Sequence, residues 1–521
     1  MNPLADLLGS VLDRRLPSIS TSKIGKVDNK IIRDAVWGMI EVEAHEALLI
    51  DTPLFQRLRG IFQTGFTYLV YPCAVHSRFE HSLGCLHLAG RIVDRLRRGS
   101  CSQIDEAARV TVRLAALLHD ITHCIFSHVS EPLYERDERV EGAKSEIAKL
   151  FHPDTPEIGA AEAVTFGLIT SDRFAQFLDE MRCIVGKDKL PDEVSPTDIA
   201  RLIVGLPPLK HQDRLFLAQI INGPFDADKL DYQARDGYFT GVTMPVDLDR
   251  LLASLCVGKR KNQQVLAVDH RGIAPLEQLL FNRMLLYDSV YHHHKIRAAV
   301  RLFRRAAERD KTLTLDWLLD HDEYDFIGQG KRSGALRELV ARLRARDLPR
   351  RAVVIHPATV NDDTPEWRHR IAQYLAESDP FDREESQKWL DGIEESIKQE
   401  LPSELRDSFC LDVPKPPKFQ RIQNTTYVKL AENHLVNLDE IFKITSVLNS
   451  YAQQSKYRMY VFAERESELK VAAAAFKAFS FHGIHLNGEA FRLAKLRPED
   501  VGIEAGETVP ERKPMHGVLA P

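Results

Sequence analysis

The sequence of 521 residues lacks any apolar run that approaches the roughly 18 residues needed to cross a membrane as a helix. Residues 1–20 mix acids, bases and proline, so the basic-then-apolar pattern of a secretory signal peptide is missing as well. Hydrophobic residues make up 44% and charged residues 28%, which is ordinary for a folded protein and excludes wholesale disorder. We therefore expect a soluble protein without a membrane-spanning segment.

Cysteine is scarce. The seven cysteines are scattered, and no two of them form a C-x-x-C pair. An odd number at irregular spacing argues against a disulfide framework and against a structural zinc site. The simplest expectation is a protein of the reducing cytoplasm.

An excess of positive charge is also missing. There are 70 Lys and Arg residues against 75 Asp and Glu residues, which gives a net charge of −5. This balance argues against a bulk basic field for nucleic acid, although it leaves a local patch open. Stretches in which basic and aromatic residues alternate are absent too. Nucleic acid is therefore not an expected partner.

The N-terminal half is predicted to be mainly helical. Apolar residues recur at helical spacing over 83–96 and 110–118. The stretch 278–305 contains neither Gly nor Pro and predicts another, longer helix. Val265–Val268 is the short strand candidate in this half.

The pattern changes after about residue 310. Strands are predicted over 352–355, 427–430 and 457–462, helices over 367–400 and 466–479, and three prolines at 414, 416 and 417 indicate a linker or a rigid turn. The predicted fold class is therefore mainly α, with a helical core and a smaller α+β C-terminal region. The expected parts are an N-terminal segment (1–29), the core (30–310), the α+β region (311–496) and a flexible tail (497–521).

Three segments of the core carry residues suited to a metal centre. They contain His81, the pair His119-Asp120, and Asp228. Imidazole and carboxylate ligands suit divalent Fe, Mn, Ni, Co, Zn or Mg, and four such ligands leave positions for water and substrate. Adjacent residues cannot face the same way in the middle of a helix, so we expect the His119-Asp120 pair at a helix C-terminus.

Each of these residues also has a structural explanation. His81 alone fits a partly buried histidine, Asp228 alone fits a helix N-cap, and a His-Asp dipeptide is common. The joint occurrence of all four favours the metal centre.

The neighbouring residues suit a phosphoester. Asp228, Tyr232 and Asp236 follow each other at i, i+4 and i+8, so on a helix they share one face. Positive charge for phosphate oxygens is available from Arg78, Lys229 and Arg283. A solvated helix face remains the alternative for Arg283, a core aromatic position the alternative for Tyr291, and an exposed run the alternative for residues 292–294.

The order His81, His119-Asp120, Asp228 resembles the H…HD…D signature of the HD-domain metal-dependent phosphohydrolases. The sequence around these residues resembles the branch of this family that hydrolyses deoxynucleoside triphosphates (dNTPs) to triphosphate, including its bacterial members. The resemblance extends from about residue 30 to residue 305, and it is carried by the stretches 51–59, 78–84, 126–128, 228–236 and 290–294 together with Gln63.

The resemblance implies a role for each matching residue. The metal, a divalent ion such as Mn, Mg, Fe, Ni, Co or Zn, would be bound by His81, His119, Asp120 and Asp228. The triphosphate would be contacted by Arg78, Lys229 and Arg283, and the sugar by Gln63, Tyr232, Asp236 and Tyr291. Catalysis would involve His123, Glu131 and His128, and the pocket would be lined by His128 and His293. An effector nucleotide would meet Asp51, Gln56 and Arg59.

Two departures from the family pattern stand out. Pro156 occupies the position where a catalytic His is expected, and His152 lies close by in the sequence. In the effector site, Arg33 replaces an expected Asn and Trp37 an expected His. The second departure argues against activation by a guanine nucleotide.

The resulting expectation is a cytoplasmic, homo-oligomeric enzyme of two to six subunits that converts dNTPs to nucleoside and triphosphate. One alternative is an HD phosphohydrolase for another substrate, such as a nucleoside monophosphate or a cyclic or modified nucleotide. The other is a non-catalytic sensor of nucleotides or of single-stranded nucleic acid.

Overall fold

The computed structural model describes residues 4–20, 27–99, 104–151, 158–328, 334–361, 371, 380–415, 425–431, 434–441, 443–455 and 458–502, with only the backbone at 380–386 and 452–455. The chain is mainly α, as predicted, and forms two compact units. Unit 1 comprises Met1–Leu286, Ala307–Ser333 and Gln420–Thr445, and unit 2 the remainder. The two units are each built from several separate stretches of the chain, whereas the sequence analysis expects parts that follow one another. The expected boundaries at residues 29, 310 and 496 stay a prediction.

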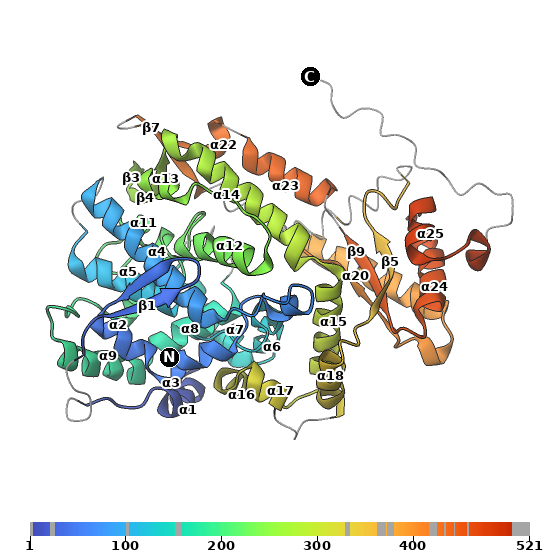
Figure 1. Cartoon of the computed structure of the whole chain (residues 1–521), viewed down its shortest axis with the longest axis horizontal. Helices are drawn as coiled ribbons and strands as arrows, with labels where there is room; N and C mark the ends of the chain where they lie inside the picture. Colours follow the sequence, from blue (N-terminus) through green and yellow to red (C-terminus); the bar gives the residue numbers. More distant parts are fainter. Residues whose placement is uncertain are drawn as a thin grey trace. The chain divides into compact units, whose positions relative to one another are not determined.

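Three helices of unit 1 carry the residues of the candidate metal centre. They are α4 (Arg78–Arg98), α5 (Glu106–Leu118) and α12 (Ala227–Thr240), and α4 packs against both of the others (Figure 1). Helix α4 begins with a capping box, in which Glu80 accepts a hydrogen bond from the backbone of Ser77. The predicted helices over 83–96 and 110–118 lie within α4 and α5.

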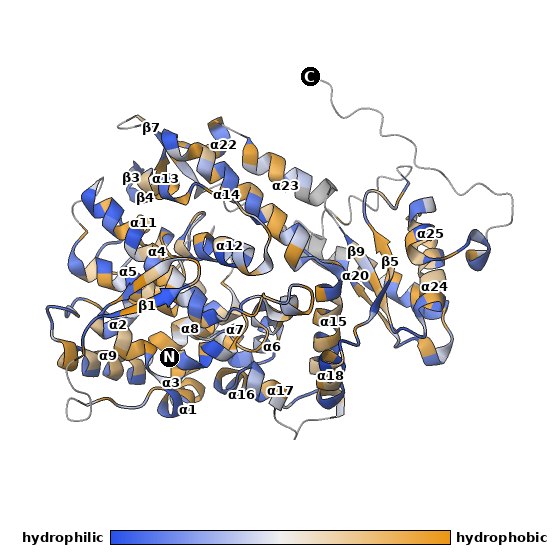
Figure 2. Cartoon of the chain, in the orientation of Figure 1, coloured by the Kyte–Doolittle hydropathy of each residue, from blue (hydrophilic) through white to orange (hydrophobic). Residues whose placement is uncertain are grey.

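Short helices complete the α layer of unit 1. Helices such as these combine orange and blue residues in Figure 2, the pattern of amphipathic helices on an apolar core. They are α1 (Ala5–Arg15), α2 (Ala44–Ile50), α3 (Pro53–Gln56), α6 (Glu131–Tyr134), α7 (Glu138–Ala148), α8 (Ala160–Ile169), α9 (Asp172–Val185), α10 (Pro196–Ile203), α11 (Leu215–Gln219), α13 (Leu248–Ala253), α14 (Ile273–Leu286), α16 (Leu315–Asp320), α17 (Glu323–Gly328) and α22 (Leu438–Ile441). No described helix is both long and apolar enough to cross a membrane.

Two small sheets belong to unit 1. Strands β1 (Lys30–Asp34) and β2 (Gly38–Val42) form an antiparallel hairpin. The second sheet has the order β3-β4-β7-β8, with strands β3 (Leu255–Arg260), β4 (Gln263–Asp269), β7 (Tyr427–Ala431) and β8 (His434–Asn437). Strand β7 was expected in the C-terminal region, but it pairs in parallel with β4, and this pairing places it in unit 1.

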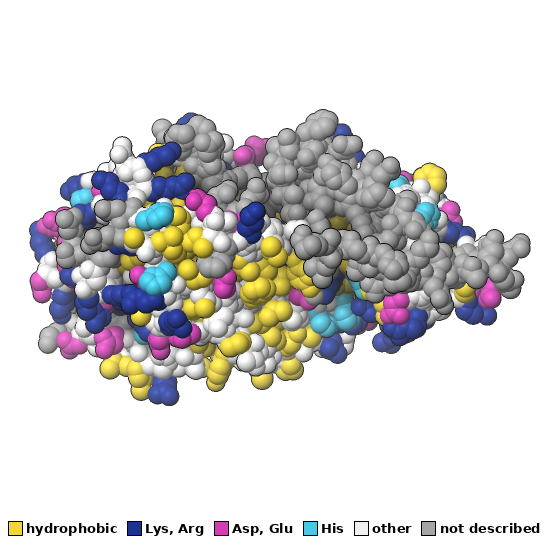
Figure 3. Space-filling view, turned by 90° about the horizontal axis from the view of Figure 1, so that it is seen from above, with side chains coloured by type: hydrophobic (Ala, Val, Ile, Leu, Met, Phe, Trp, Pro, Cys, Tyr) yellow, Lys and Arg dark blue, Asp and Glu magenta, His cyan; other side chains and the backbone are white. Residues whose placement is uncertain are grey.

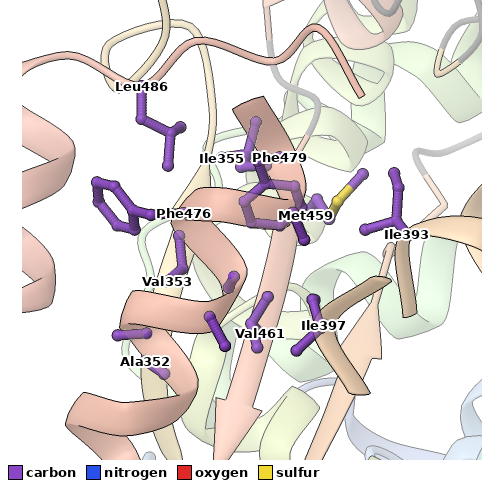
Figure 4. Packing of buried hydrophobic residues seen from close by; sticks show 14 of the residues in the cluster. Ala352, Val353, Ile355, Ile393, Ile397, Met459, Val461, Phe476, Phe479 and Leu486 are labelled. Carbon is purple, nitrogen blue, oxygen red and sulfur yellow. The ribbon is translucent and has the colours of Figure 1, made fainter. Parts of the chain in front are cut away.

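Unit 2 contains a three-stranded antiparallel sheet of order β5-β9-β6, with β5 (Arg350–Ile355), β6 (Phe409–Asp412) and β9 (Met459–Ala463). Every residue of β9 is buried, and since successive side chains point to opposite faces, both faces of the sheet are covered at this strand. Met459 and Val461 join the cluster with α20 (Pro380–Gln399) and α24 (Glu468–Phe481) shown in Figure 4, whereas Tyr460 and Phe462 pack with α15 (His294–Glu308). The other helices are α18 (Gly334–Arg344), α23 (Ile444–Ser455) and α25 (Gly488–Ala494).

The prediction of one continuous helix over 278–305 is wrong. Helix α14 ends at Leu286, a π-helical turn spans Tyr287–Tyr291, and α15 begins at His294. Without Gly or Pro the stretch carries no local signal for this break, because a π-turn arises from a changed hydrogen-bond register rather than from a breaker residue. The predicted residues 367–370, 372–379, 416, 417, 457 and 503–521 lie outside the described part of the chain.

Candidate active site

The four predicted metal ligands converge in unit 1. His119 is the C-cap of α5, so the chain turns where His119 and Asp120 follow each other, as expected. Nε2 of His81 lies 3.1 Å from Oδ1 of Asp228 and 3.4 Å from Oδ2 of Asp120. Nε2 of His119 lies 3.4 Å from the same Asp120 oxygen. These atoms are close enough to share one ion.

The hydrogen bonds of the two imidazoles leave Nε2 for a metal. Nδ1 of His119 lies 2.8 Å from the carbonyl oxygen of Ala116, and Nδ1 of His81 lies 2.7 Å from Oδ2 of Asp231. Both partners accept hydrogen bonds, so each Nδ1 carries the proton and Nε2 presents a lone pair. Nε2 of His119 is buried and has no hydrogen-bond partner among the described residues. This donor set fits a divalent cation.

Carboxylates and arginine set the electrostatics of the centre. Arg78 is 2% exposed; its Nη1 pairs with Asp120, and its Nε donates to Oγ of Ser127 at 3.1 Å. Burial opposes ionisation of Asp120, but Arg78 and the nearby histidines hold its pKa well below the usual value. Burial likewise opposes protonation of His81, yet Cys85 and the carboxylates of Asp120, Asp228 and Asp231 raise its pKa well above its usual value, so a proton and a metal ion compete for Nε2. This cluster of side chains therefore favours ionised carboxylates and bound positive charge.

Asp228 does not cap helix α12, so its explanation as an N-cap is wrong. The cap is Asp226, whose Oδ1 accepts a hydrogen bond from the backbone of Lys229 at 2.8 Å. Nζ of Lys229 pairs with the other oxygen of Asp226 at 2.6 Å. Asp228 thus sits in the first turn and directs its carboxylate toward His81.

The loop after α5 places a second group of polar residues beside Asp120. Nε2 of His123 lies 3.1 Å from Oδ1 of Asp120, and Nδ1 of His128 lies 2.7 Å from Oε1 of Glu131. Burial and the Arg78 charge lower the pKa of His123 to about 4. Burial opposes ionisation of Glu131, but His128 lowers its pKa to about 2, and Glu131 in turn raises the pKa of His128 against burial. The loop therefore combines a neutral imidazole with an ion pair.

The residues predicted for the sugar are partly brought together. Nε2 of His76 lies 2.8 Å from Oδ1 of buried Asp236, and the carbonyl oxygen of His76 accepts a hydrogen bond from the backbone of Gln63 at 3.0 Å. Tyr232 is half-buried one turn before Asp236 on α12, as its spacing predicts. Arg283 is half-buried on α14, which packs against α12.

Tyr291 and His293 belong to unit 2, so their contribution to this site stays a prediction. The explanation of 292–294 as an exposed run is wrong, because His292 is buried and its two neighbours are half-buried. His152 and Pro156 lie outside the described residues.

The effector candidates lie near the surface. Exposed Asp51 pairs with Nζ of Lys30 at 2.6 Å, and Nε of exposed Arg59 donates to Oε1 of Gln56 at 2.7 Å. The Arg59 guanidinium also lies 3.5 Å from the ring centre of Phe79. In contrast, Trp37 points inward and donates its indole N–H to Asp231.

Three residues of the site were not assigned a role from the sequence. Asp231 supports His81, His76 supports Asp236, and the Cys85 sulfur lies 3.6 Å from Nε2 of His81. Asp231 follows Asp228 by three residues and precedes Arg235 by four, so helical spacing was the available signal. Cys85 follows His81 by one helical turn; burial raises the pKa of its thiol.

Comparison with known families agrees with this geometry. Residues 78–165 match the HD domain, which contains three of the four predicted ligands, and residues 246–487 match the HD-associated region. The chain therefore contains an HD domain followed by an HD-associated region.

Some similar proteins are named as uncharacterised and others are named after an enzymatic activity. The chain is 31% identical over 302 residues to an uncharacterised protein of Methanocaldococcus jannaschii, covering 57% of this chain and 54% of the relative. It is 32% identical over 279 residues to the deoxynucleoside triphosphate triphosphohydrolase SAMHD1 homolog of Dictyostelium discoideum (52% and 48% covered), and 31% identical over 272 residues to deoxynucleoside triphosphate triphosphohydrolase SAMHD1 of Homo sapiens (51% and 42%). The matched region is about half the length of these relatives.

A solved structure supports the fold. The crystal structure of a hypothetical protein from Aquifex aeolicus aligns with a TM-score of 0.58 at 23% identity, and the alignment covers 86% of this chain and 99% of that one.

Proposed function

We propose that this protein is a metal-dependent phosphohydrolase that converts dNTPs to nucleoside and triphosphate. The observation that carries the proposal is the convergence of His81, His119, Asp120 and Asp228 beside the buried guanidinium of Arg78. Two relatives are named deoxynucleoside triphosphate triphosphohydrolases, which supports the choice of substrate.

The positive side chains would bind the phosphates. Arg78, Lys229 and Arg283 would neutralise charge on the non-bridging oxygens, and this charge grows in the transition state. In the structure Arg78 pairs with Asp120 and Lys229 with Asp226, so each would exchange or share its carboxylate when triphosphate binds. A bound divalent ion would supply Lewis acidity and lower the pKa of water.

Residues of the loop after α5 would accept and donate the protons that the reaction moves. Water attacks the α-phosphorus, the bond to the sugar 5′ oxygen breaks, and that oxygen takes up a proton. His123 would accept a proton from the attacking water, because burial and the Arg78 charge keep its imidazole neutral beside Asp120, 3.1 Å away. His128, paired with Glu131, would return a proton to the leaving oxygen. Gln63, Tyr232 and Asp236 would hold the sugar.

Product identification tests this proposal. Purified protein with Mn or Mg and each dNTP should yield triphosphate and deoxynucleoside by mass spectrometry. His119→Ala and Asp120→Ala should abolish turnover, whereas the control His270→Ala, at an exposed histidine, should retain it. Products limited to diphosphate or monophosphate would refute the triphosphohydrolase version.

A different phosphoester substrate is the second candidate, because Pro156 stands where the family pattern has a catalytic His. A panel of nucleoside monophosphates, cyclic nucleotides and modified nucleotides, scored by product, separates the two. A non-catalytic sensor is the third candidate, and it would bind without turnover and independently of chelator. The face in Figure 3 mixes basic with acidic side chains, which does not favour nucleic acid as its ligand.

Family analogy also suggests a homo-oligomer of two to six subunits and an effector nucleotide at Asp51, Gln56 and Arg59. Sedimentation with and without dNTPs tests the first. Assays of dNTPs in pairs test the second, because an effector would accelerate hydrolysis of its companion.

A further inference from the structure

Glu323 is a buried acid outside the HD domain. It is the first residue of α17, is 0% exposed and lies within the HD-associated region. Its Oε1 accepts a hydrogen bond from the backbone of Phe126 at 2.7 Å, and both oxygens lie 3.1 Å from the backbone nitrogen of Phe62. No basic side chain of the described residues pairs with it. Its carboxyl group therefore accepts hydrogen bonds from backbone amides and forms no ion pair with a described basic residue.

Both amides belong to segments of the candidate active site. Phe126 lies in the loop between His123 and His128, and it has a φ of 58°, followed by 53° at Ser127. Two successive left-handed non-glycine residues need support from their surroundings. Glu323 supplies such support at Phe126, where the turn begins.

The second amide links this loop to the sugar and phosphate residues. Phe62 immediately precedes Gln63, and its carbonyl oxygen accepts a hydrogen bond from Oγ of Ser127 at 2.7 Å. The same Oγ accepts from Nε of Arg78. One carboxyl group thus joins the two chain segments that carry His128 and Gln63, and Ser127 connects them to Arg78.

The segment that carries Glu323 is itself fixed to the loop. Buried Arg57 donates through Nη2 to the carbonyl oxygen of His123 at 2.7 Å, and through Nη1 to that of His321 at 3.2 Å. The ring of Phe326 packs edge-on against that of Phe126, with 5.4 Å between centroids. Glu323 is therefore held in place from both sides.

We infer that Glu323 is a positioning residue, whose carboxyl group fixes the backbone of Phe126 and Phe62 and so aligns the His123–Glu131 loop with Gln63 and Arg78. The HD-associated region then completes a site whose ligands come mainly from the HD domain. Glu323 contacts no reacting atom, and the catalytic part of the inference rests on the proposed function.

Two uncharged substitutions of similar size isolate the hydrogen bonds. In Glu323→Gln the amide oxygen accepts both backbone N–H groups, whereas in Glu323→Met nothing accepts them. We expect kcat of the Gln variant within about threefold of wild type. The Met variant should lose about 30-fold in kcat, as a displaced loop does, with little change in KM and an unchanged metal content. Glu138→Met, at an exposed glutamate, is the control.

Hydrogen exchange measures the alignment without substrate. The amides of Phe62 and Phe126 should be protected in wild type and in the Gln variant, and the 121–131 loop should exchange faster in the Met variant. Wild-type kcat in the Met variant, or an unprotected Phe126 amide in wild type, would overturn the inference. If the Met variant does not fold, protection and activity in the Gln variant decide. Protection as expected in a chain that hydrolyses no dNTP would refute the proposed function alone.

Discussion

Oδ2 of Asp231 lies 2.7 Å from Nδ1 of His81 and orients this imidazole toward the candidate metal position. Asp231 follows Asp228 on helix α12, so one helix carries both a candidate ligand and the residue that orients another candidate ligand. The same carboxylate accepts hydrogen bonds from Arg235 and from the indole of Trp37. The β1–β2 hairpin, which carries Trp37 in its turn, is thereby tied to the centre.

Replacing Asp231 should lower the metal affinity more than it lowers the activity at saturating metal. In Asp231→Asn the negative charge beside His81 is lost while the shape is kept, so we expect metal affinity to fall about 10- to 100-fold. Titration calorimetry with Mn checks this, and at saturating metal most of the activity should return. Asp249→Asn, at an exposed aspartate, is the matched control. Unchanged affinity in Asp231→Asn would remove Asp231 from the centre.

Gly84→Ala should destabilise the same arrangement. A Cβ at Gly84 would lie 1.8 Å from Oδ1 of Asp231 and 2.6 Å from Nη2 of Arg235. Both groups are buried and paired, so the free energy of unfolding should fall by about 1–3 kcal/mol. Urea titration measures it. Gly9→Ala is the control, because a Cβ there meets nothing within 4 Å. An unchanged free energy of unfolding in Gly84→Ala would mean that the Asp231 side chain can move away from the added Cβ.

Local patterns explain which parts of this description could be predicted. Helices α4 and α5 have apolar residues at helical spacing, and the four ligand types and the face of Asp228, Tyr232 and Asp236 can be read from the sequence. The pairing of β4 with β7 joins residues such as Ala267 and Tyr427, and no local signal reports such a contact. For the same reason the partners of Glu323 could not be predicted, since it reaches Phe62 and Phe126 only through the tertiary fold.

The stability of the protein should depend on pH through Glu323. Burial raises the pKa of this carboxyl from 4.5 to about 8, although its backbone hydrogen bonds oppose the shift. The folded state therefore keeps a proton that the unfolded state has lost. The contribution of Glu323 to the free energy of unfolding is therefore fully present below about pH 4.5 and is lost as pH rises through about 8. Over this window wild type should lose up to about 1.4 kcal/mol per pH unit relative to Glu323→Gln.

Urea unfolding of both proteins across the window provides the measurement. The Gln side chain does not titrate, so the difference between the two curves isolates Glu323 from all other groups. Parallel curves would mean that the carboxyl is ionised in the folded protein at neutral pH, and would contradict the raised pKa.

Metal removal should destabilise the folded chain. An ion that binds only the native state adds about 2.7 kcal/mol to the free energy of unfolding at a concentration 100 times its Kd. Chelation should therefore lower the melting temperature, and added Mn should restore it. In His119→Ala the unpartnered Nε2 is gone, so the same titration should leave the melting temperature unchanged, whereas His270→Ala should respond like wild type. A full response in His119→Ala would place the ion elsewhere and would separate metal binding from the four converging side chains.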